Sequence, residues 1–98
     1  MRKIHNYIHG SAYSISDKEM GVEDPSTGEE IAKVVLSSKE DFNKTLQSSK
    51  KSQLDWANTT PLKRSRILSN YKTIIENNIS ELASIVSQEH GKTLDDAK

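Results

Sequence analysis

The spacing of the apolar residues changes near residue 37 and divides the chain into two regions. Before that point, apolar residues stand in short runs or at spacing two, which is the period of a half-buried strand. We expect short strands, arranged as two small hairpins, at residues 3–8, 13–15, 20–22 and 31–36. Strands this short need further packing partners, so this region is not expected to be stable alone.

The segment Asp24-Pro25-Ser26-Thr27-Gly28 has the composition of a tight turn. Pro25 fixes its own φ angle and Gly28 tolerates a positive φ. The Asp24 side chain can accept a hydrogen bond from the backbone that follows it. A further turn is expected at His9-Gly10, so both turns separate predicted strands.

After residue 37 the apolar residues recur every three or four positions, as they do on one face of a helix. Four pairs predict helix starts, namely Ser38 with Asp41, Thr60 with Pro61, Asn78 with Glu81, and Thr93 with Asp96. Gly91 stands where a left-handed residue closes a helix. We expect three amphipathic helices, divided near Trp56 and at Asn77-Asn78, and a fourth that opens shortly before Lys98.

The second predicted helix carries the strongest apolar pattern. We call it the apolar stripe, and it consists of Ile67, Leu68, Tyr71, Ile74 and Ile75. Its i, i+4, i+7 spacing indicates a buried face. The inward face of the third helix is expected to hold Leu82, Ile85, Val86 and Ile79, and Phe42 and Leu46 are expected to share one face of the first helix.

Composition suggests that these faces need a partner. Apolar residues make up 33% of the 98 residues, and only four glycines are present. A typical soluble domain, counted with glycine, reaches roughly 45–50%. A chain this short buries about two-thirds of its unfolded surface, which leaves stability near balance. The helix that opens near Lys98 also suggests to us a truncated domain.

Charge and cysteine content restrict the possible partners. Fourteen basic and fourteen acidic residues give zero net charge, without the positive field of a nucleic-acid binder. No stretch approaches the ~20 apolar residues of a membrane span, and residues 4–7 are no signal-peptide core. With no cysteine, there are no disulfides. We expect a cytoplasmic protein with no nucleic-acid and no membrane partner.

The sequence predicts no catalytic, cofactor-binding or metal-binding residue. Gly91-Lys92-Thr93 ends like a phosphate-binding loop, but that motif requires glycine at position 86, where Val stands. A helix end followed by a new helix start explains the same residues. His5 and His9 would lie some 13 Å apart on a strand, too far to share an ion. Trp56 is interpreted as a packing residue rather than a ligand platform.

Two motifs together resemble the beginning of the aldehyde dehydrogenase superfamily. Asp24-Pro25-Ser26-Thr27-Gly28-Glu29 resembles the family's Asn-Pro-Ala-Thr-Gly-Glu turn, and Glu89-His90-Gly91-Lys92-Thr93 its later helix end. Tyr7-Ile8-His9-Gly10, Trp56 and the 61–68 stretch with Arg64 follow at matching intervals. The resemblance implies an α+β chain of N-terminal β-hairpins and three helices. It would be a single incomplete domain over 1–98, with strands in 1–36 and helices in 37–98, like the start of the NAD-binding domain.

Within that family, Glu89-His90-Gly91-Lys92-Thr93-Leu94 is most similar to the methylmalonate-semialdehyde dehydrogenases. Those enzymes use NAD and acylate coenzyme A, forming propionyl-CoA or acetyl-CoA in valine and pyrimidine breakdown. The resemblance implies thiolate attack on the aldehyde, hydride transfer to NAD and thioester transfer to coenzyme A. In the family, the catalytic cysteine and asparagine and the cofactor-binding lysine all lie beyond the position of Lys98. We therefore expect this chain to bind neither cofactor and to be structural and inactive.

Alternatives remain open at this stage. The chain could derive from another aldehyde dehydrogenase, such as the succinate-semialdehyde type, or be a free-standing helical interaction module without catalytic descent. The expected partner is the rest of the parent dehydrogenase or a second copy. Contact would be made through the apolar stripe and through the face that bears Leu82 and Val86.

Overall fold

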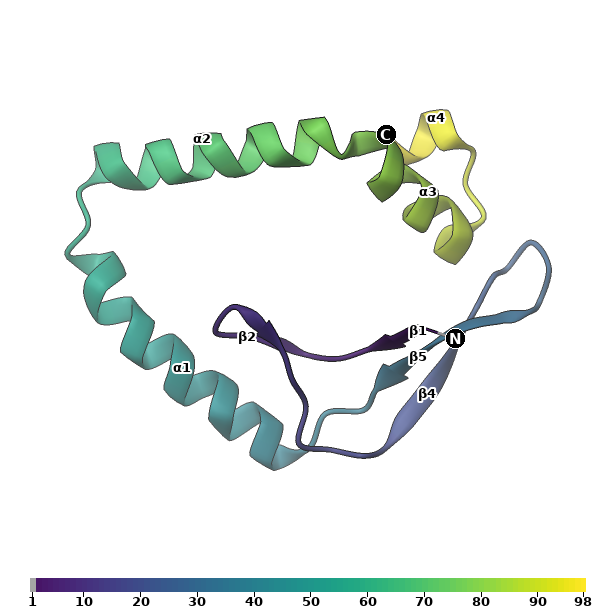
Figure 1. Cartoon of the computed structure of the whole chain (residues 1–98), viewed down its shortest axis with the longest axis horizontal. Coiled ribbons are helices and arrows are strands. Elements are labelled where there is room, and N and C mark those ends of the chain that lie inside the picture. Colours follow the sequence, from purple (N-terminus) through teal and green to yellow (C-terminus); the bar gives the residue numbers. More distant parts are fainter. Residues whose placement is uncertain (1) are drawn as a thin grey trace. The chain divides into compact units, whose positions relative to one another are not determined.

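The computed structural model describes residues 2–98 and has short strands followed by helices (Figure 1). The strands are β1 (Arg2–Ile4), β2 (Tyr7–Ile8), β3 (Ser11–Ala12), β4 (Glu19–Glu23) and β5 (Glu30–Val35). The helices are α1 (Lys39–Ala57), α2 (Pro61–Asn77), α3 (Ile79–His90) and α4 (Leu94–Ala97). The predicted α+β class, with strands first and helices after, is confirmed.

The chain forms two compact units, and the boundary does not fall where strands give way to helices. One unit contains the chain up to residue 23 together with residues 30–56. The other contains residues 24–29 and 57–98. The turn between β4 and β5 therefore belongs with the later helices and not with its own strands.

The first unit contains a three-stranded sheet in the order β1-β5-β4 and the separate hairpin β2-β3. Two hairpins form, β2-β3 and β4-β5, and both pair antiparallel, but the first joins residues 7–8 to 11–12 and not to the strand predicted at 13–15. In addition, β1 pairs parallel with β5, with Arg2 opposite Ala32 and Ile4 opposite Val34. A parallel pair has no tight turn between its strands, so the local turn signals did not reveal it. The core of this unit holds Ile8, Ala32 and Val35.

The strand predicted around Tyr13 and Ile15 is absent. The Tyr13 N–H still donates to the Asn6 carbonyl beside the hairpin, at 2.8 Å, but the backbone from Ile15 on has another hydrogen-bond partner. The carboxylate of Asp41 accepts bonds from the backbone N–H groups of Ile15 (2.7 Å) and Ser16 (3.2 Å). These donors would otherwise need a neighbouring strand. From Ile15 on, the segment before β4 is thus fixed by a helix side chain instead of by a sheet.

Asp41 also begins helix α1, as its pairing with Ser38 predicted. Its Oδ2 accepts from the backbone N–H of Ser38 at 2.9 Å and from the Ser38 hydroxyl at 3.0 Å. In return, the Ser38 hydroxyl accepts from the Asp41 N–H at 3.3 Å. This is a reciprocal capping box, and Asp41 is only 1% exposed. Phe42 and Leu46, one turn apart on α1, are 62% and 41% exposed.

In the second unit, α2 and α3 are separated by a single residue, Asn78. Thr60 caps α2 as predicted, because its hydroxyl accepts from the N–H of Lys63 at 3.3 Å. The predicted side-chain cap of α3 by Asn78 is wrong. Its Nδ2 donates back to the carbonyl of Ile74 at 2.8 Å, so the side chain serves the end of α2 instead.

The predicted burial of the apolar stripe is also wrong within this chain. No residue of α2 is buried, and Ile67, Leu68, Tyr71 and Ile74 are 51–61% exposed. On α3 the buried residue is Ala83, while Leu82 is 41% exposed. Ile79, Ile85 and Val86 are half-buried. Ile75 of the stripe is half-buried, whereas no element of the unit covers the other four residues.

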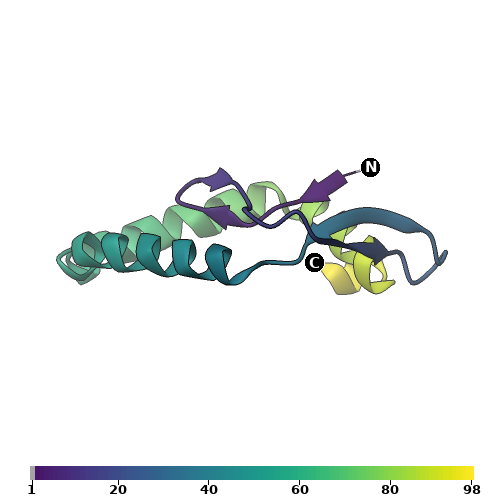
Figure 2. The ribbon, with the colours of Figure 1, turned by 90° about the horizontal axis from the view of Figure 1, so that it is seen from below.

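Helix α4 follows α3 closely and folds back against it (Figures 1 and 2). Thr93 caps α4 as predicted, because its hydroxyl accepts from the N–H of Asp96 at 3.3 Å. In addition, the Ser87 hydroxyl donates to the carbonyl of Lys92 at 2.6 Å, which ties the connection to α3. No helix among residues 2–98 is long and apolar enough to cross a bilayer.

The Asp41 network predicts how the chain responds to acid. Hydrogen bonds from the backbone of Ser38 and Ile15 lower the pKa of Asp41 from 3.8 to about 2. A depressed pKa contributes stability that is fully present above pH 3.8 and is lost as the pH falls towards 2. As the pH is lowered from 3.8 to about 2, we expect the urea midpoint of unfolding to drop further in the wild type than in Asp41→Asn.

Urea unfolding followed by circular dichroism from pH 6 to pH 2 measures this difference. Asp17→Asn is the matched control, because Asp17 is exposed and follows Ser16, one of the residues whose backbone Asp41 binds. It should keep the acid sensitivity of the wild type. Equal acid sensitivity in Asp41→Asn and wild type would contradict the role of this carboxylate.

Candidate functional site

The Gly91-Lys92-Thr93 segment is a junction between two helices. Gly91 ends α3 with a left-handed backbone (φ 71°), and its N–H donates to the carbonyl of Ser87 at 2.8 Å. Thr93 then caps α4. Both features agree with the predicted helix end and new helix start. A phosphate-binding loop would instead follow a strand.

The turn at residues 24–29 closes on itself, with Asp24 at its centre. The Asp24 side chain accepts from the N–H of Ser26 at 2.8 Å, and its carbonyl accepts from the N–H of Gly28 at 2.7 Å. The Asp24 N–H donates to the carbonyl of Glu29 at 2.9 Å. Gly28 has φ 73°, so the positive φ expected there is confirmed.

This turn and the end of α3 touch one another. A β-carbon built on Gly91 would lie 3.3 Å from Cγ of Pro25 and 3.4 Å from Oγ of Ser26. Glycine is therefore favoured at position 91 for two reasons, the left-handed backbone and the close approach of the turn. The two motifs that carried the family resemblance form one structural contact, although 59 residues separate them in sequence.

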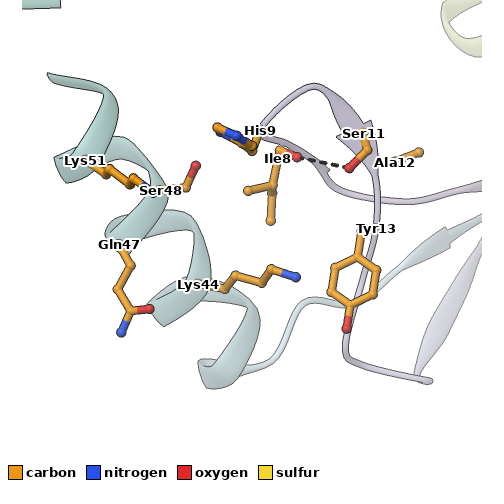
Figure 3. Close-up of a pocket in the computed structure, with 9 residues that line it drawn as sticks. All are labelled: Ile8, His9, Ser11, Ala12, Tyr13, Lys44, Gln47, Ser48 and Lys51. Carbon is orange, nitrogen blue, oxygen red and sulfur yellow. Dashed lines mark hydrogen bonds between the residues drawn. The ribbon is translucent and has the colours of Figure 1, made fainter. Parts of the chain in front are cut away.

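The first unit has a groove between the β2-β3 hairpin and α1 (Figure 3). Its volume is about 550 Å³, and its lining consists of Ile8, His9, Ser11, Ala12, Tyr13, Lys44, Gln47, Ser48 and Lys51. The ammonium of Lys44 lies 3.5 Å from the centre of the Tyr13 ring, a cation–π contact. His9 stands in the hairpin turn with φ 51°.

The chemistry that this groove offers is limited. Its lining contains no carboxylate, and the hydroxyl of Ser11 donates to the carbonyl of Ile8 at 3.4 Å. Among the described residues, the His9 imidazole makes no hydrogen bond to a hydroxyl of the lining, as the base of an activated nucleophile would. Within residues 2–98, no group of three His, Cys, Asp or Glu side chains could hold a metal ion. Periodicity did not reveal the groove because its residues come from a hairpin and a helix far apart in sequence.

Arg64, on α2, is the second feature that the sequence did not reveal. Its residue is half-buried, and its Nε is buried without a hydrogen-bond partner among the residues that the structure describes. An unpaired buried donor is costly and uncommon in folded proteins.

Comparison with known proteins identifies the architecture. The profile named "Aldehyde dehydrogenase family" matches residues 13–98. The chain belongs to the aldehyde dehydrogenase family. This membership explains why the turn and the α3 end resemble that family's motifs, and it removes the alternative of a helical module without dehydrogenase descent.

Several members of the family are similar over nearly the whole chain. Malonate-semialdehyde dehydrogenase of Pseudomonas aeruginosa is 35% identical over 97 residues, which cover 99% of this chain and 20% of the relative. A Dictyostelium discoideum protein, assigned as an acylating mitochondrial methylmalonate-semialdehyde/malonate-semialdehyde dehydrogenase, is 38% identical over 93 residues. That match covers 94% of this chain and 18% of the relative.

A solved structure gives the same result for the fold. A Sinorhizobium meliloti protein, assigned as methylmalonate-semialdehyde dehydrogenase and solved with NAD, superposes with a TM-score of 0.96 at 35% identity. The match covers 99% of this chain and 20% of that one. This aldehyde dehydrogenase chain therefore spans about one-fifth of the length of the relatives it matches.

The contact between the turn and α3 can be tested with two glycine variants. Gly91→Ala should lower the free energy of unfolding by about 2 kcal/mol, because it adds crowding against Pro25 to the cost of a left-handed alanine. Gly28→Ala should cost only about 1 kcal/mol, because its φ is similar but no atom lies within 4 Å of its added carbon. Urea unfolding of both variants measures the difference. Equal losses would show that the close approach to Pro25 contributes nothing.

Proposed function

We propose that this chain forms the opening segment of an NAD-dependent dehydrogenase that oxidises methylmalonate or malonate semialdehyde and acylates coenzyme A. The observation that carries the proposal is the match over 99% of the chain, at a TM-score of 0.96, to a relative assigned to that activity and solved with NAD. The acylating relative from Dictyostelium discoideum supports coenzyme A as acceptor. A succinate-semialdehyde or other hydrolytic dehydrogenase is the second candidate within the family.

In this proposal the segment has a structural role and not a catalytic one. The chain contains no cysteine, so it cannot supply the thiolate on which the family's reaction depends. Its helices α2 and α3 present apolar side chains to solvent, with the stripe more than half exposed from Ile67 to Ile74. The rest of the dehydrogenase is proposed to cover these faces. A cytoplasmic location remains a prediction.

A hybrid enzyme tests the proposal directly. This chain replaces the matching segment of the Pseudomonas aeruginosa malonate-semialdehyde dehydrogenase, of which it covers 20%. We expect the hybrid to fold and to form NADH from malonate semialdehyde with coenzyme A, because the segment provides the same backbone. Coenzyme A dependence is measured beside the unaltered enzyme. A hybrid that is insoluble, or folded but inactive, would contradict the proposed role.

The isolated 98-residue chain should oxidise no aldehyde. We expect no NADH from purified chain supplied with methylmalonate semialdehyde, coenzyme A and NAD, because it contains no cysteine. Calorimetric titration with NAD should show no micromolar affinity, because no glycine-rich turn follows a strand here. NADH formation in a preparation shown by mass spectrometry to be free of other dehydrogenases would overturn this prediction.

A further inference from the structure

Arg64 lies on the same face of α2 as the apolar stripe. Leu68, Tyr71 and Ile75 follow it by four, seven and eleven residues, which are the positions that share one side of a helix. Arg64 is half-buried, whereas Leu68 and Tyr71 are 59% and 61% exposed. A cationic side chain therefore lies in line with the exposed apolar residues.

The Nε–H of Arg64 is buried, yet it has no acceptor among the described residues. A buried donor is stabilised only when an acceptor reaches it, and a charged donor favours a carboxylate. Its neighbour in sequence, Arg66, is exposed. Of these two arginines, only the one in line with the stripe has a buried donor without an acceptor.

We propose that the α2 face formed by the apolar stripe and Arg64 docks against an apolar protein surface that presents a carboxylate, and that the Arg64 side chain, whose Nε–H is covered in the isolated chain, turns to donate to it. This inference rests on the proposed function, since the surface would belong to the part of the dehydrogenase outside this chain. That part makes up about four-fifths of the relatives, of which this chain covers 18–20%. The carboxylate would complete the donor's hydrogen bonding when the apolar faces close.

A second copy of the chain, paired face to face along α2, fits this requirement poorly. The one carboxylate of α2 is Glu76, which lies about 120° around the helix from Arg64 at 3.6 residues per turn. Glu76 also pairs with Lys72, with Nζ 3.7 Å from Oε1. An α2–α2 dimer would cover the stripe but leave the arginine without its acceptor.

Two substitutions separate the hydrogen bond from the rest of the side chain. Arg64→Met places a methyl group near the position of Nε, and Arg64→Gln places an N–H donor there without the charge. In the isolated chain, Arg64→Met should raise the urea midpoint, because it removes an unpaired buried donor. In the hybrid enzyme described above, the same substitution should shorten the half-life of heat inactivation about tenfold or more, because it removes a paired donor.

Arg64→Gln should keep the half-life of the hybrid within about threefold of its parent, because one N–H bond is retained. Arg66→Met is the matched control and should change neither measurement. Helix content by circular dichroism verifies that each isolated variant folds as the parent chain does. The opposite sign of the Arg64→Met effect in the two settings is the expected signature of a donor that is paired only after docking.

Each other outcome counts against a specific statement. A stable, active hybrid in which Arg64→Met has no effect would overturn this inference and leave the proposed function intact. A lower urea midpoint for Arg64→Met in the isolated chain would show that Nε already has an acceptor, which overturns it as well. If the hybrid does not fold even with Arg64 present, the proposed function fails, and the inference fails with it.

Discussion

The carboxylate of Asp41 holds the first unit together. It gathers backbone donors from Ile15 and Ser16 and both donors of Ser38 around one buried anion. One side chain thereby starts helix α1 and fixes the segment between β3 and β4. The small apolar core of Ile8, Ala32 and Val35 could not position that segment alone, since no residue between β3 and β4 is buried. Charge-assisted bonds to backbone N–H groups replace the apolar packing that such a short chain lacks.

In the second unit the apolar residues are present, but most of them are not covered. Helix α2 has no buried residue, and α3 buries only Ala83. Local interactions fix the helix ends at Thr60, Gly91 and Thr93. These helices are thus well defined individually, while their apolar faces lack a partner. Exposed apolar faces of this kind mark interaction surfaces.

Most of the fold was predictable wherever its cause was local in sequence. The caps at Ser38, Thr60 and Thr93, the turn at Asp24 and the left-handed Gly91 all follow from side chains a few residues from the groups they serve. The cap assigned to Asn78 was wrong because its amide had a second local partner, the carbonyl of Ile74. Burial of the apolar stripe was wrong because periodicity shows which face is apolar but not whether this chain contains the surface that covers it. The close approach of Pro25 to Gly91 depends on a distant segment, and the unpaired Nε of Arg64 depends on burial that helical spacing does not predict, so only the structure could reveal them.

The parallel pairing of β1 with β5 has a consequence for the order in which the chain acquires structure during synthesis. β1 leaves the ribosome first, but its partner follows only after residues 5–29 have been made. β4 is separated from β5 by residues 24–29 alone, so closing that loop costs about 1 kcal/mol less. The β4-β5 hairpin should therefore form first and serve as the template that β1 joins. The N-terminal strand, although it is made earliest, would be the last strand of the sheet to find its place.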